Sequence, residues 1–175
     1  MFHFTAVMIG DAMERIAVVP GSFDPVTVGH LDIIHRASAM FDKVIVAVMV
    51  NASKSPVFTS EERVDMLMRS VADIPKVTDE PFGGLLADFV RQKNACAIVK
   101  GLRAVSDFEY EFQMALINKK LNEDLETVFF TANAENMYLS SSVVKSVASV
   151  NGDIKDFVPA CIHNDILKKF NKKGV

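Results

Sequence analysis

The chain lacks both of the common sequence patterns for a phosphate-binding loop. Neither G-x-G-x-x-G nor G-x-x-x-x-G-K-[ST] occurs in its 175 residues, so it carries no Rossmann dinucleotide fingerprint and no P-loop. It also has only two cysteines, Cys96 and Cys161, far apart and in apolar surroundings. We expect both to be buried or bystander thiols rather than a disulfide or a metal pair. The four histidines show no zinc-type spacing either.

Long apolar runs and a strong excess of one charge are missing too. The longest apolar stretches fall far short of the ~18–20 residues that span a bilayer, so no membrane partner is expected. A net charge of −3 argues against a dedicated nucleic-acid binder. The first 15 residues lack a basic start and contain Asp11 and Glu14, which makes them a poor signal peptide. We expect a cytoplasmic protein in which residues 1–14 are a non-functional extension and residues 15–175 form one domain.

The sequence does contain short β-branched runs that alternate with longer helical patterns. The expected strands cover residues 15–20, 43–50, 76–78, 96–100 and 126–131. The expected helices cover residues 31–41, 59–71, 85–94, 106–121, 140–149 and 163–170, and capping boxes open two of them, at residues 59–62 and 106–109. This order predicts an α/β protein with a single-domain, doubly wound parallel sheet. In such a sheet, ligands bind at the carboxyl ends of the strands, where the strand order reverses.

The loop after the first expected strand has the composition of an anion-binding site. In VVPGSFDPVTVGH (residues 18–30), Gly21 lets the backbone approach a ligand, Ser22 offers a hydroxyl, and Thr27 is a good N-cap. His30 falls in the first turn of the next helix, on the same side as Thr27. The free N–H groups and the helix dipole attract an anion there, and the imidazole can donate a hydrogen bond to a phosphate oxygen. From these residues alone, a capped helix whose histidine packs or faces solvent is the alternative.

Three blocks of the sequence together resemble one known family. The T-x-G-H of residues 27–30 is similar to the [HT]-x-G-H signature of the nucleotidyltransferase superfamily. The longer PGSFDPVTVGH resembles bacterial phosphopantetheine adenylyltransferases, as do KGLRAVSDFEYE (residues 100–111) and YLSSSVVK (residues 138–145). The resemblance extends over about residues 15–167, with the blocks in the family's order. It implies a Rossmann-like nucleotidyltransferase fold for residues 15–175.

The resemblance also implies a reaction. An adenylyl group passes reversibly from ATP to 4'-phosphopantetheine, giving dephospho-coenzyme A and pyrophosphate, in coenzyme A biosynthesis. The substrate phosphate attacks the α-phosphorus in line, so the protein supplies positioning and charge stabilisation rather than a nucleophile. The sequence fits this demand, because it places His, Lys and Arg side chains at loop ends and shows no Ser-His-Asp pattern.

Residue roles in the first block follow from the same resemblance. Ser22 and Phe23 would contact the nucleotide, with Ser22 also facing phosphopantetheine; the family often has Thr at position 22, and Ser keeps the hydroxyl. His30 would contact ATP and stabilise the pentavalent transition state. Lys54, in the loop after the second expected strand, would reach the attacking and transferred phosphates. From the residues alone, a solvated loop lysine is an equal alternative for Lys54.

The second block supplies candidates for both substrates. Lys100 stands where the family has Arg or Lys, and would bind the phosphate of phosphopantetheine, although lysine lacks the bidentate fork of arginine. Leu86, after two glycines, would line the pantetheine arm, with an ordinary core leucine as the alternative. The ATP-contacting positions implied here are Gly101, Leu102, Arg103 and Glu111, of which Arg103 would also be catalytic.

The third block stands at an expected helix start. Hydroxyls and free N–H groups there can hold the β- and γ-phosphates of ATP, while one serine acts as the N-cap. The implied ATP contacts are Tyr138, Leu139, Ser140, Ser141 and Ser142. Asn136 departs from the aromatic residue often found in the family, which leaves the packing of the adenine edge open.

The resemblance further implies Mg²⁺ arriving with ATP, a homohexamer, and feedback binding of coenzyme A. The ion would be carried by the phosphates of ATP, since few protein carboxylates are available to cage it. One alternative function is a related nucleotidyltransferase acting on glycerol phosphate or nicotinamide mononucleotide; Thr27 and the second block speak against it. The other alternative, from a different class, is a non-catalytic nucleotide-binding module.

Overall fold

The computed structural model describes residues 14–50 and 55–171, and within them five parallel strands form one sheet. The strands are β1 (Ile16–Gly21), β2 (Lys43–Met49), β3 (Val77–Phe82), β4 (Ala97–Leu102) and β5 (Glu126–Thr131). Their spatial order is β3-β2-β1-β4-β5. The central residues of β1 and β2 are buried on both faces, as their continuous apolar sequences predict.

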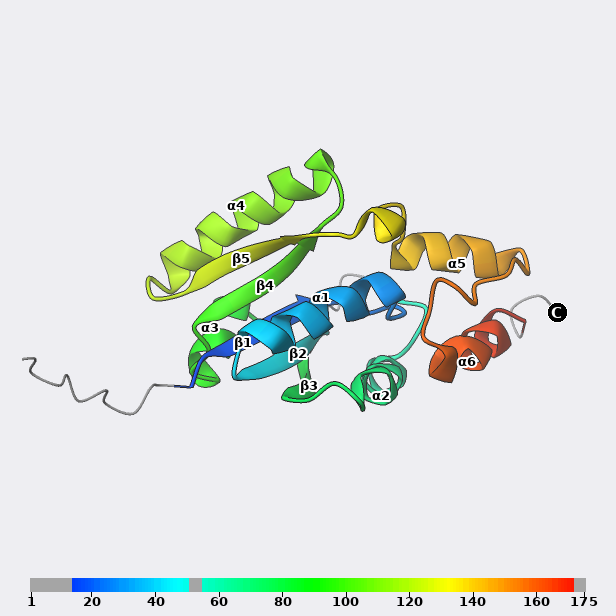
Figure 1. The fold of residues 1–175 in the computed structure, drawn as a ribbon, viewed down its shortest axis with the longest axis horizontal. Coiled ribbons are helices and arrows are strands. Elements are labelled where there is room, and N and C mark those ends of the chain that lie inside the picture. The colour runs from blue at the N-terminus through cyan, green and yellow to red at the C-terminus, as the bar shows by residue number, and fades with distance from the viewer. Residues whose placement is uncertain (1–13, 51–54, 172–175) are drawn as a thin grey trace, which may run out of the picture.

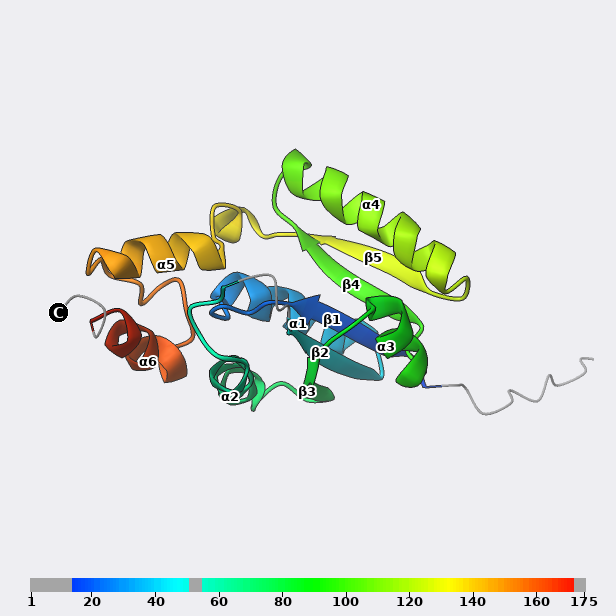
Figure 2. The same cartoon turned by 180° about the vertical axis from the view of Figure 1, so that it is seen from behind.

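Helices cover both faces of this sheet, which confirms the predicted doubly wound α/β fold. They are α1 (Val28–Met40), α2 (Ser60–Val71), α3 (Leu86–Gln92), α4 (Val105–Leu121), α5 (Ser141–Ser149) and α6 (Ala160–Asn171), with a short 3-10 helix η1 (Ala134–Asn136). Figure 1 shows α1 and α2 on the near side of the sheet, and Figure 2, from behind, shows α3 on the other side. α5 and α6 lie beyond the carboxyl ends of the strands, where the chain leaves β5 (Figure 1).

Two apolar clusters, one on each face, hold the layers together. Alternate residues of β1 divide between them: Ala17 and Val19 join the cluster with α1, α2, α5 and α6, and Val18 joins the cluster with α3. This division follows from the alternation of side chains along a strand. Burial of the apolar surface on both sides is the main favourable term for this fold.

Several local predictions differ from the structure. α4 begins at Val105. Its N-cap residue is Ala104, which makes no side-chain capping hydrogen bond, so the prediction that a capping box at residues 106–109 opens this helix is wrong. β3 continues past Thr78 to Phe82 through Asp79, Glu80 and Pro81. Among the described strands, β3 pairs with β2 alone, and an edge strand tolerates proline.

Both Cys96 and Cys161 are exposed free thiols, which agrees with the expectation of bystander thiols and excludes the alternative that they are buried. The capping box at Thr59 is confirmed, with Thr59 accepting from the Glu62 N–H and Glu62 accepting in return. Among the described residues, no helix combines the length and the apolar character needed to cross a bilayer.

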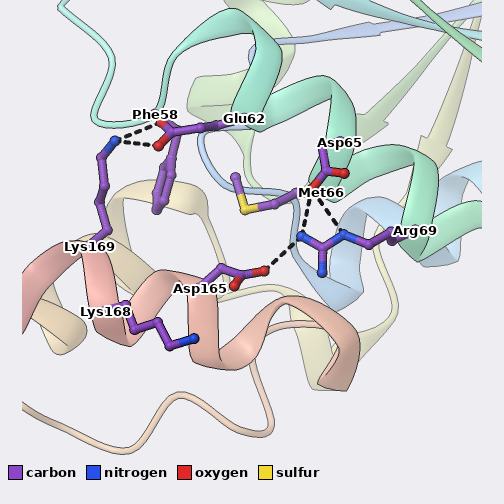
Figure 3. A pocket seen from close by; sticks show the side chains of 8 residues that line it. All are labelled: Phe58, Glu62, Asp65, Met66, Arg69, Asp165, Lys168 and Lys169. Carbon is purple, nitrogen blue, oxygen red and sulfur yellow. Dashed lines mark hydrogen bonds and ion pairs between the residues drawn. The ribbon is translucent and has the colours of Figure 1, made fainter.

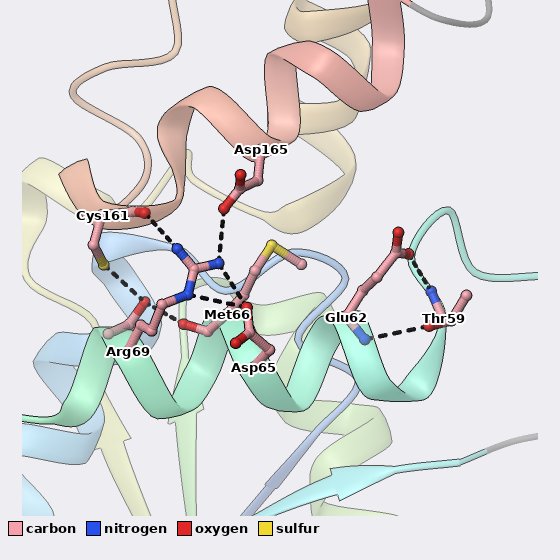
Figure 4. Close-up of polar contacts among 8 residues, drawn as sticks. Thr59, Glu62, Asp65, Met66, Arg69, Cys161 and Asp165 are labelled. Atoms are coloured by element: carbon pink, nitrogen blue, oxygen red, sulfur yellow. Dashed lines mark hydrogen bonds and ion pairs between the residues drawn. The ribbon is translucent and has the colours of Figure 1, made fainter.

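Charged side chains fasten α6 to α2. Arg69 donates to Asp65 on its own helix, to Asp165 at 2.7 Å, and to the backbone carbonyl of Cys161 at 2.7 Å (Figure 4). Lys169 donates to both carboxylate oxygens of Glu62. These contacts place the C-terminal helix beside α2, near the carboxyl edge of the sheet.

Candidate active site

The strand order reverses between β1 and β4. From β1 the chain moves outward to β2 and β3, then returns to the other side of β1 as β4 and continues to β5. Loops that leave neighbouring strands at such a reversal diverge and leave a crevice, which is the usual ligand site of an open α/β sheet. All three sequence blocks lie at this carboxyl edge, directly after β1, at the end of β4, and after β5.

Thr27 and His30 form a reciprocal cap at the start of α1. The Thr27 side chain accepts a hydrogen bond from the His30 N–H, and the His30 Nδ1 accepts one from the Thr27 N–H at 3.0 Å. A neutral imidazole carries its proton on only one nitrogen. Because Nδ1 acts as the acceptor, the proton lies on Nε2, which makes that nitrogen a donor. The capping interpretation and the phosphate-binding interpretation of His30 are therefore compatible.

The backbone of Phe23 adopts a conformation that is uncommon for a bulky residue. Its φ of 47° lies in the left-handed region, where non-glycine residues are strained and are often found at functional sites. The ring is buried and packs edge-on against the His30 ring, with centroids 5.1 Å apart. A contact between Phe23 and a nucleotide would therefore come from its backbone, while the ring supports His30.

The surroundings of His30 keep its imidazole neutral. Burial lowers the pKa of His30 to about 4, and the positive charge of Arg103 adds to the effect. Arg103 itself donates to both carboxylate oxygens of Asp107 and, at 3.0 Å, to the backbone carbonyl of Leu139. The site thus combines a neutral hydrogen-bond donor with a fixed cation.

A pH titration by NMR tests this state of His30. The imidazole is expected to show the Nε2–H tautomer at neutral pH, with a midpoint near pH 4. Because the folded-state pKa lies below the ordinary 6.5, protonation favours the unfolded chain, and His30 lowers stability as pH falls from about 6.5 towards 4. A His30→Gln variant assigns the signal and should lose this part of the pH dependence. A midpoint above 6 would contradict the buried environment.

Hydrogen bonds join the third block to the first. The Ser141 hydroxyl donates to the backbone carbonyl of Pro25 at 2.8 Å, and Lys145 donates to Asp24 at 2.6 Å. Near Gly29, the closest side chains include Asn136 and Leu139. The start of α5 therefore lies directly beside the start of α1.

The three predicted serines have different surroundings. Ser140 is the N-cap of α5 and accepts from the Val143 N–H, which confirms that one of the three acts as a cap. Ser141 is used in the bond to the first block, and Ser142 is exposed. Tyr138 is exposed and meets Phe157 edge-on, whereas the side chain of Leu139 is buried.

In the second block, two predicted site residues pair with each other. Lys100, on β4, contacts both carboxylate oxygens of Glu111, on α4, at 3.1 and 3.3 Å. Both side chains are about four-fifths buried, at 20% and 21% exposure. Gly101 follows in β4, and a Cβ there would lie 2.9 Å from the side chain of Ile33 on α1, so any other residue would force Ile33 to shift. Leu102 ends the strand, half-buried.

Two predicted site residues remain, Leu86 and Lys54. Leu86 follows the edge strand β3, and the other residue is not among those that the structure describes. Leu86 is the first residue of α3, after β3, and packs partly against the apolar cluster of that face. Lys54 lies outside the described residues. β3 is the edge strand next to β2, so Leu86 lies two strands from β1.

No functional role was predicted from the sequence for three polar residues at this edge of the sheet: Asp24, Arg63 and Lys145. Asp24 is 5% exposed and accepts from Lys145 and from the N–H groups of Val57 and Phe58. Arg63 is 3% exposed, within α2. The sequence did contain a signal for Arg63, because it occupies the apolar stripe of its helix, whose other buried members are Met66, Leu67 and Val71.

A hollow of about 440 Å³ lies elsewhere, between α2 and α6 (Figure 3). Its wall carries charged side chains of both signs, and two ion pairs, Arg69–Asp165 and Lys169–Glu62, join the two helices. None of the predicted site residues lines it. The strand ends, rather than this hollow, therefore form the candidate active site.

Carboxylates at the strand ends are engaged with cations. Asp24 pairs with Lys145, Asp107 with Arg103, and Glu111 with Lys100. Within the described residues, no group of three or more His, Cys, Asp or Glu side chains is arranged to hold a metal ion.

The sequence is similar to known proteins over most of its length. Residues 18–147 match the cytidylyltransferase-like family model. The chain is 57% identical over 159 residues to phosphopantetheine adenylyltransferase of Clostridium tetani, covering 91% of this chain and 99% of the relative. It is 58% identical over 156 residues to that of Clostridium kluyveri, covering 89% and 95%.

A solved structure shares the fold at low identity. Plasmodium falciparum nicotinic acid mononucleotide adenylyltransferase, complexed with NaAD, superposes with a TM-score of 0.66 at 14% identity, covering 93% of this chain and 97% of that one. At this identity the similarity concerns the fold alone, and it agrees with a Rossmann-like nucleotidyltransferase architecture.

Proposed function

The chain belongs to the phosphopantetheine adenylyltransferase family, and we propose that the site at its strand ends performs the family's reaction through the residues described above. The enzyme transfers the adenylyl group of ATP to 4'-phosphopantetheine, giving dephospho-coenzyme A and pyrophosphate. An oxygen of the substrate phosphate forms a bond to the α-phosphorus, and the bond from that phosphorus to pyrophosphate breaks.

The observation that carries the proposal is the joining of three distant sequence blocks at one edge. Arg103 of the second block donates to the backbone of Leu139 in the third, and Ser141 and Lys145 of the third donate to Pro25 and Asp24 in the first. These contacts bring a neutral imidazole donor, a guanidinium and a serine-capped helix start around the same crevice. Phosphoryl transfer needs such an arrangement of positioning and charge-stabilising groups.

His30 is the proposed stabiliser of the transition state. Its Nε2–H can donate to an oxygen on the transferring phosphorus, and its neutral state avoids any proton transfer to the leaving pyrophosphate. Arg103 supplies the nearby positive charge as negative charge builds up. Ser22, which is exposed after β1, contacts both substrates in this proposal.

The other predicted residues take binding roles in this proposal. Lys100 binds the phosphate of phosphopantetheine once that anion competes with Glu111, Leu86 lines the pantetheine arm, and Lys54 reaches the reacting phosphates. The ATP side comprises backbone or side-chain groups of Phe23, Gly101, Leu102, Glu111, Tyr138, Leu139, Ser140, Ser141 and Ser142. Residues 15–175 form the catalytic domain, and residues 1–14 an extension without a role.

We propose Mg²⁺ as the metal of the reaction, bound to ATP. It would neutralise phosphate charge and favour pyrophosphate as a leaving group. The carboxylates of Asp24 and Asp107 keep their cationic partners, Lys145 and Arg103, and the protein's own contribution is to hold the phosphates through Ser, His and Arg groups.

We also propose that the chain assembles as a homohexamer. Neither apolar cluster of the described residues includes a side chain of α4, and this helix exposes large apolar side chains: Val105, Phe108, Tyr110, Phe112, Leu116, Ile117 and Leu121. Burying these side chains against other copies would remove them from water. A sedimentation-equilibrium mass of six chains is expected.

Coenzyme A is proposed as a feedback ligand, because it contains both the pantetheine arm and an adenine nucleotide and can occupy both halves of the site. A cytoplasmic location is proposed from the two exposed free thiols, Cys96 and Cys161, which suit a reducing compartment.

A pyrophosphate-release assay with a panel of phosphate substrates tests the function. Turnover is expected with ATP and 4'-phosphopantetheine, and not with nicotinamide mononucleotide or glycerol phosphate. Chelation of divalent ions should abolish it, and added Mg²⁺ should restore it. Turnover with nicotinamide mononucleotide but not phosphopantetheine would refute the assignment.

A further inference from the structure

Arg63 is a buried arginine that contacts the exits of two neighbouring strands. Its Nη1 donates to the backbone carbonyl of Ser22, just after β1, at 2.7 Å, and to that of Met49, the last residue of β2, at 2.9 Å. Nη2 also contacts the hydroxyl of Ser60 at 3.3 Å. β1 and β2 are hydrogen-bonded neighbours, so one guanidinium ties together the places where they release their loops.

This burial is unusual for core packing alone. Arg63 is 3% exposed, no ion pair joins it to a carboxylate of the described residues, and its Nε lacks a hydrogen-bond partner among them. Burial of an incompletely satisfied cation is costly, and an apolar residue would suit the same helical stripe better. The two carbonyl contacts are therefore the feature that accounts for an arginine at this position.

The contact with Ser22 leads directly to the reacting groups. Ser22 is followed by Phe23, whose backbone is held at a φ of 47° and whose ring packs edge-on against His30. A shift of the Ser22 carbonyl would move Phe23 and, through its ring, the imidazole. Arg63 itself lies on α2, outside all three sequence blocks. Its described contact with the candidate site is the hydrogen bond to the backbone carbonyl of Ser22.

We propose that Arg63 is a positioning residue for adenylyl transfer, which fixes the loop after β1 against the end of β2 and thereby sets the place of Ser22 and the His30 ring. This inference rests on the proposed function. Arginine is needed, because lysine is shorter and cannot bring its nitrogen to the position from which Nη1 serves both carbonyls, and it has no second nitrogen to contact Ser60. A misplacement of about 1 Å can reduce a rate by roughly 100-fold even when the altered residue lies away from the chemistry.

The test compares Arg63→Lys and Arg63→Met with matched changes at Arg69. Arg69 lies on the same helix and also donates to a backbone carbonyl, but its partners lie on α6 and on α2 itself rather than at the exits of β1 and β2. We expect Arg63→Lys to lower kcat about 10-fold and Arg63→Met about 100-fold, measured where thermal melts show each protein folded. Arg69→Lys and Arg69→Met should lower the melting temperature and leave kcat within about twofold of wild type.

Chemical rescue separates positioning from general destabilisation. In Arg63→Ala, added guanidinium chloride should raise kcat in a saturable way, whereas sodium chloride at equal ionic strength should not. Wild-type kcat for Arg63→Lys, or equal losses at Arg63 and Arg69, would overturn the inference while leaving the function in place. A wild-type enzyme that fails to adenylylate phosphopantetheine would overturn both, and the wild-type assay alone reveals that case.

Discussion

Replacement of His30 by alanine is expected to lower kcat by roughly 10²- to 10³-fold. The imidazole offers one donor, Nε2–H, because Nδ1 is engaged with the Thr27 N–H. A donor that the protein fixes before the reaction needs no reorganisation as charge develops on the transferring phosphoryl group. In other enzymes, removal of one such donor lowers kcat by roughly this factor. Steady-state kinetics with saturating ATP and phosphopantetheine measure the effect.

His35 provides the control on the same helix. It is exposed, so His35→Ala should keep kcat close to wild type. His30→Gln, which can place an amide donor near the position of Nε2, should recover part of the rate that His30→Ala loses. ATP affinity should change little in His30→Ala, since the donor acts mainly in the transition state. A kcat within threefold of wild type would remove His30 from its proposed role.

Local sequence patterns predicted the elements whose stabilising contacts are local. The β-branched runs of β1, β2 and β5 and the box at Thr59 identify their elements within a residue or two. The prediction of a capping box at residues 106–109 was wrong, because another carboxylate, that of Asp107, accepts the hydrogen bonds at the start of α4. Asp107 accepts from both the backbone N–H and the side chain of Arg103, so the turn forms around that pair.

The pairing among site residues could not be predicted in the same way. Motif spacing identified Lys100 and Glu111 as candidates, but not the ion pair between them, which depends on how α4 lies across β4. The bond from Lys145 to Asp24 joins residues 121 apart in the chain. Such contacts follow from the crossing of whole elements, whereas periodicity reports only on one element at a time.

Asp24→Ala is expected to be the most destabilising single change at the site. The carboxylate is 5% exposed and accepts from the Lys145 ammonium at 2.6 Å and from the Phe58 and Val57 N–H groups at 2.9 and 3.2 Å. Alanine would leave these three donors without their acceptor. Removal of one partner of a buried pair costs about 3–5 kcal/mol. Because the Lys145 side chain is 27% exposed, we expect the lower end of this range, about 3 kcal/mol, which for a chain of this size corresponds to a fall in Tm of roughly 10 °C.

The pH dependence of folding stability tests whether the negative charge of Asp24 causes this stabilisation. Burial alone would raise the pKa of Asp24, but the bonds from Lys145, Phe58 and Val57 outweigh it and lower the pKa below its ordinary 3.8. The ionised form therefore stabilises the fold above that pH, and the contribution is lost as the pH falls through the lowered pKa. The difference in unfolding free energy between wild type and Asp24→Asn should be constant near neutrality and shrink in acid.

A substitution of Asp153 is the control for the general effect of removing an aspartate that lies near a lysine. Its pair with Lys155 is exposed on both sides, at 65% and 67%, so Asp153→Asn should leave Tm close to wild type. Lys145→Met removes the cation but leaves the two N–H donors on Asp24, and should cost less than Asp24→Ala. Equal losses for Asp24→Ala and Asp153→Asn would mean that water replaces the carboxylate. Asp24 could then no longer be the link that holds the third sequence block against the first.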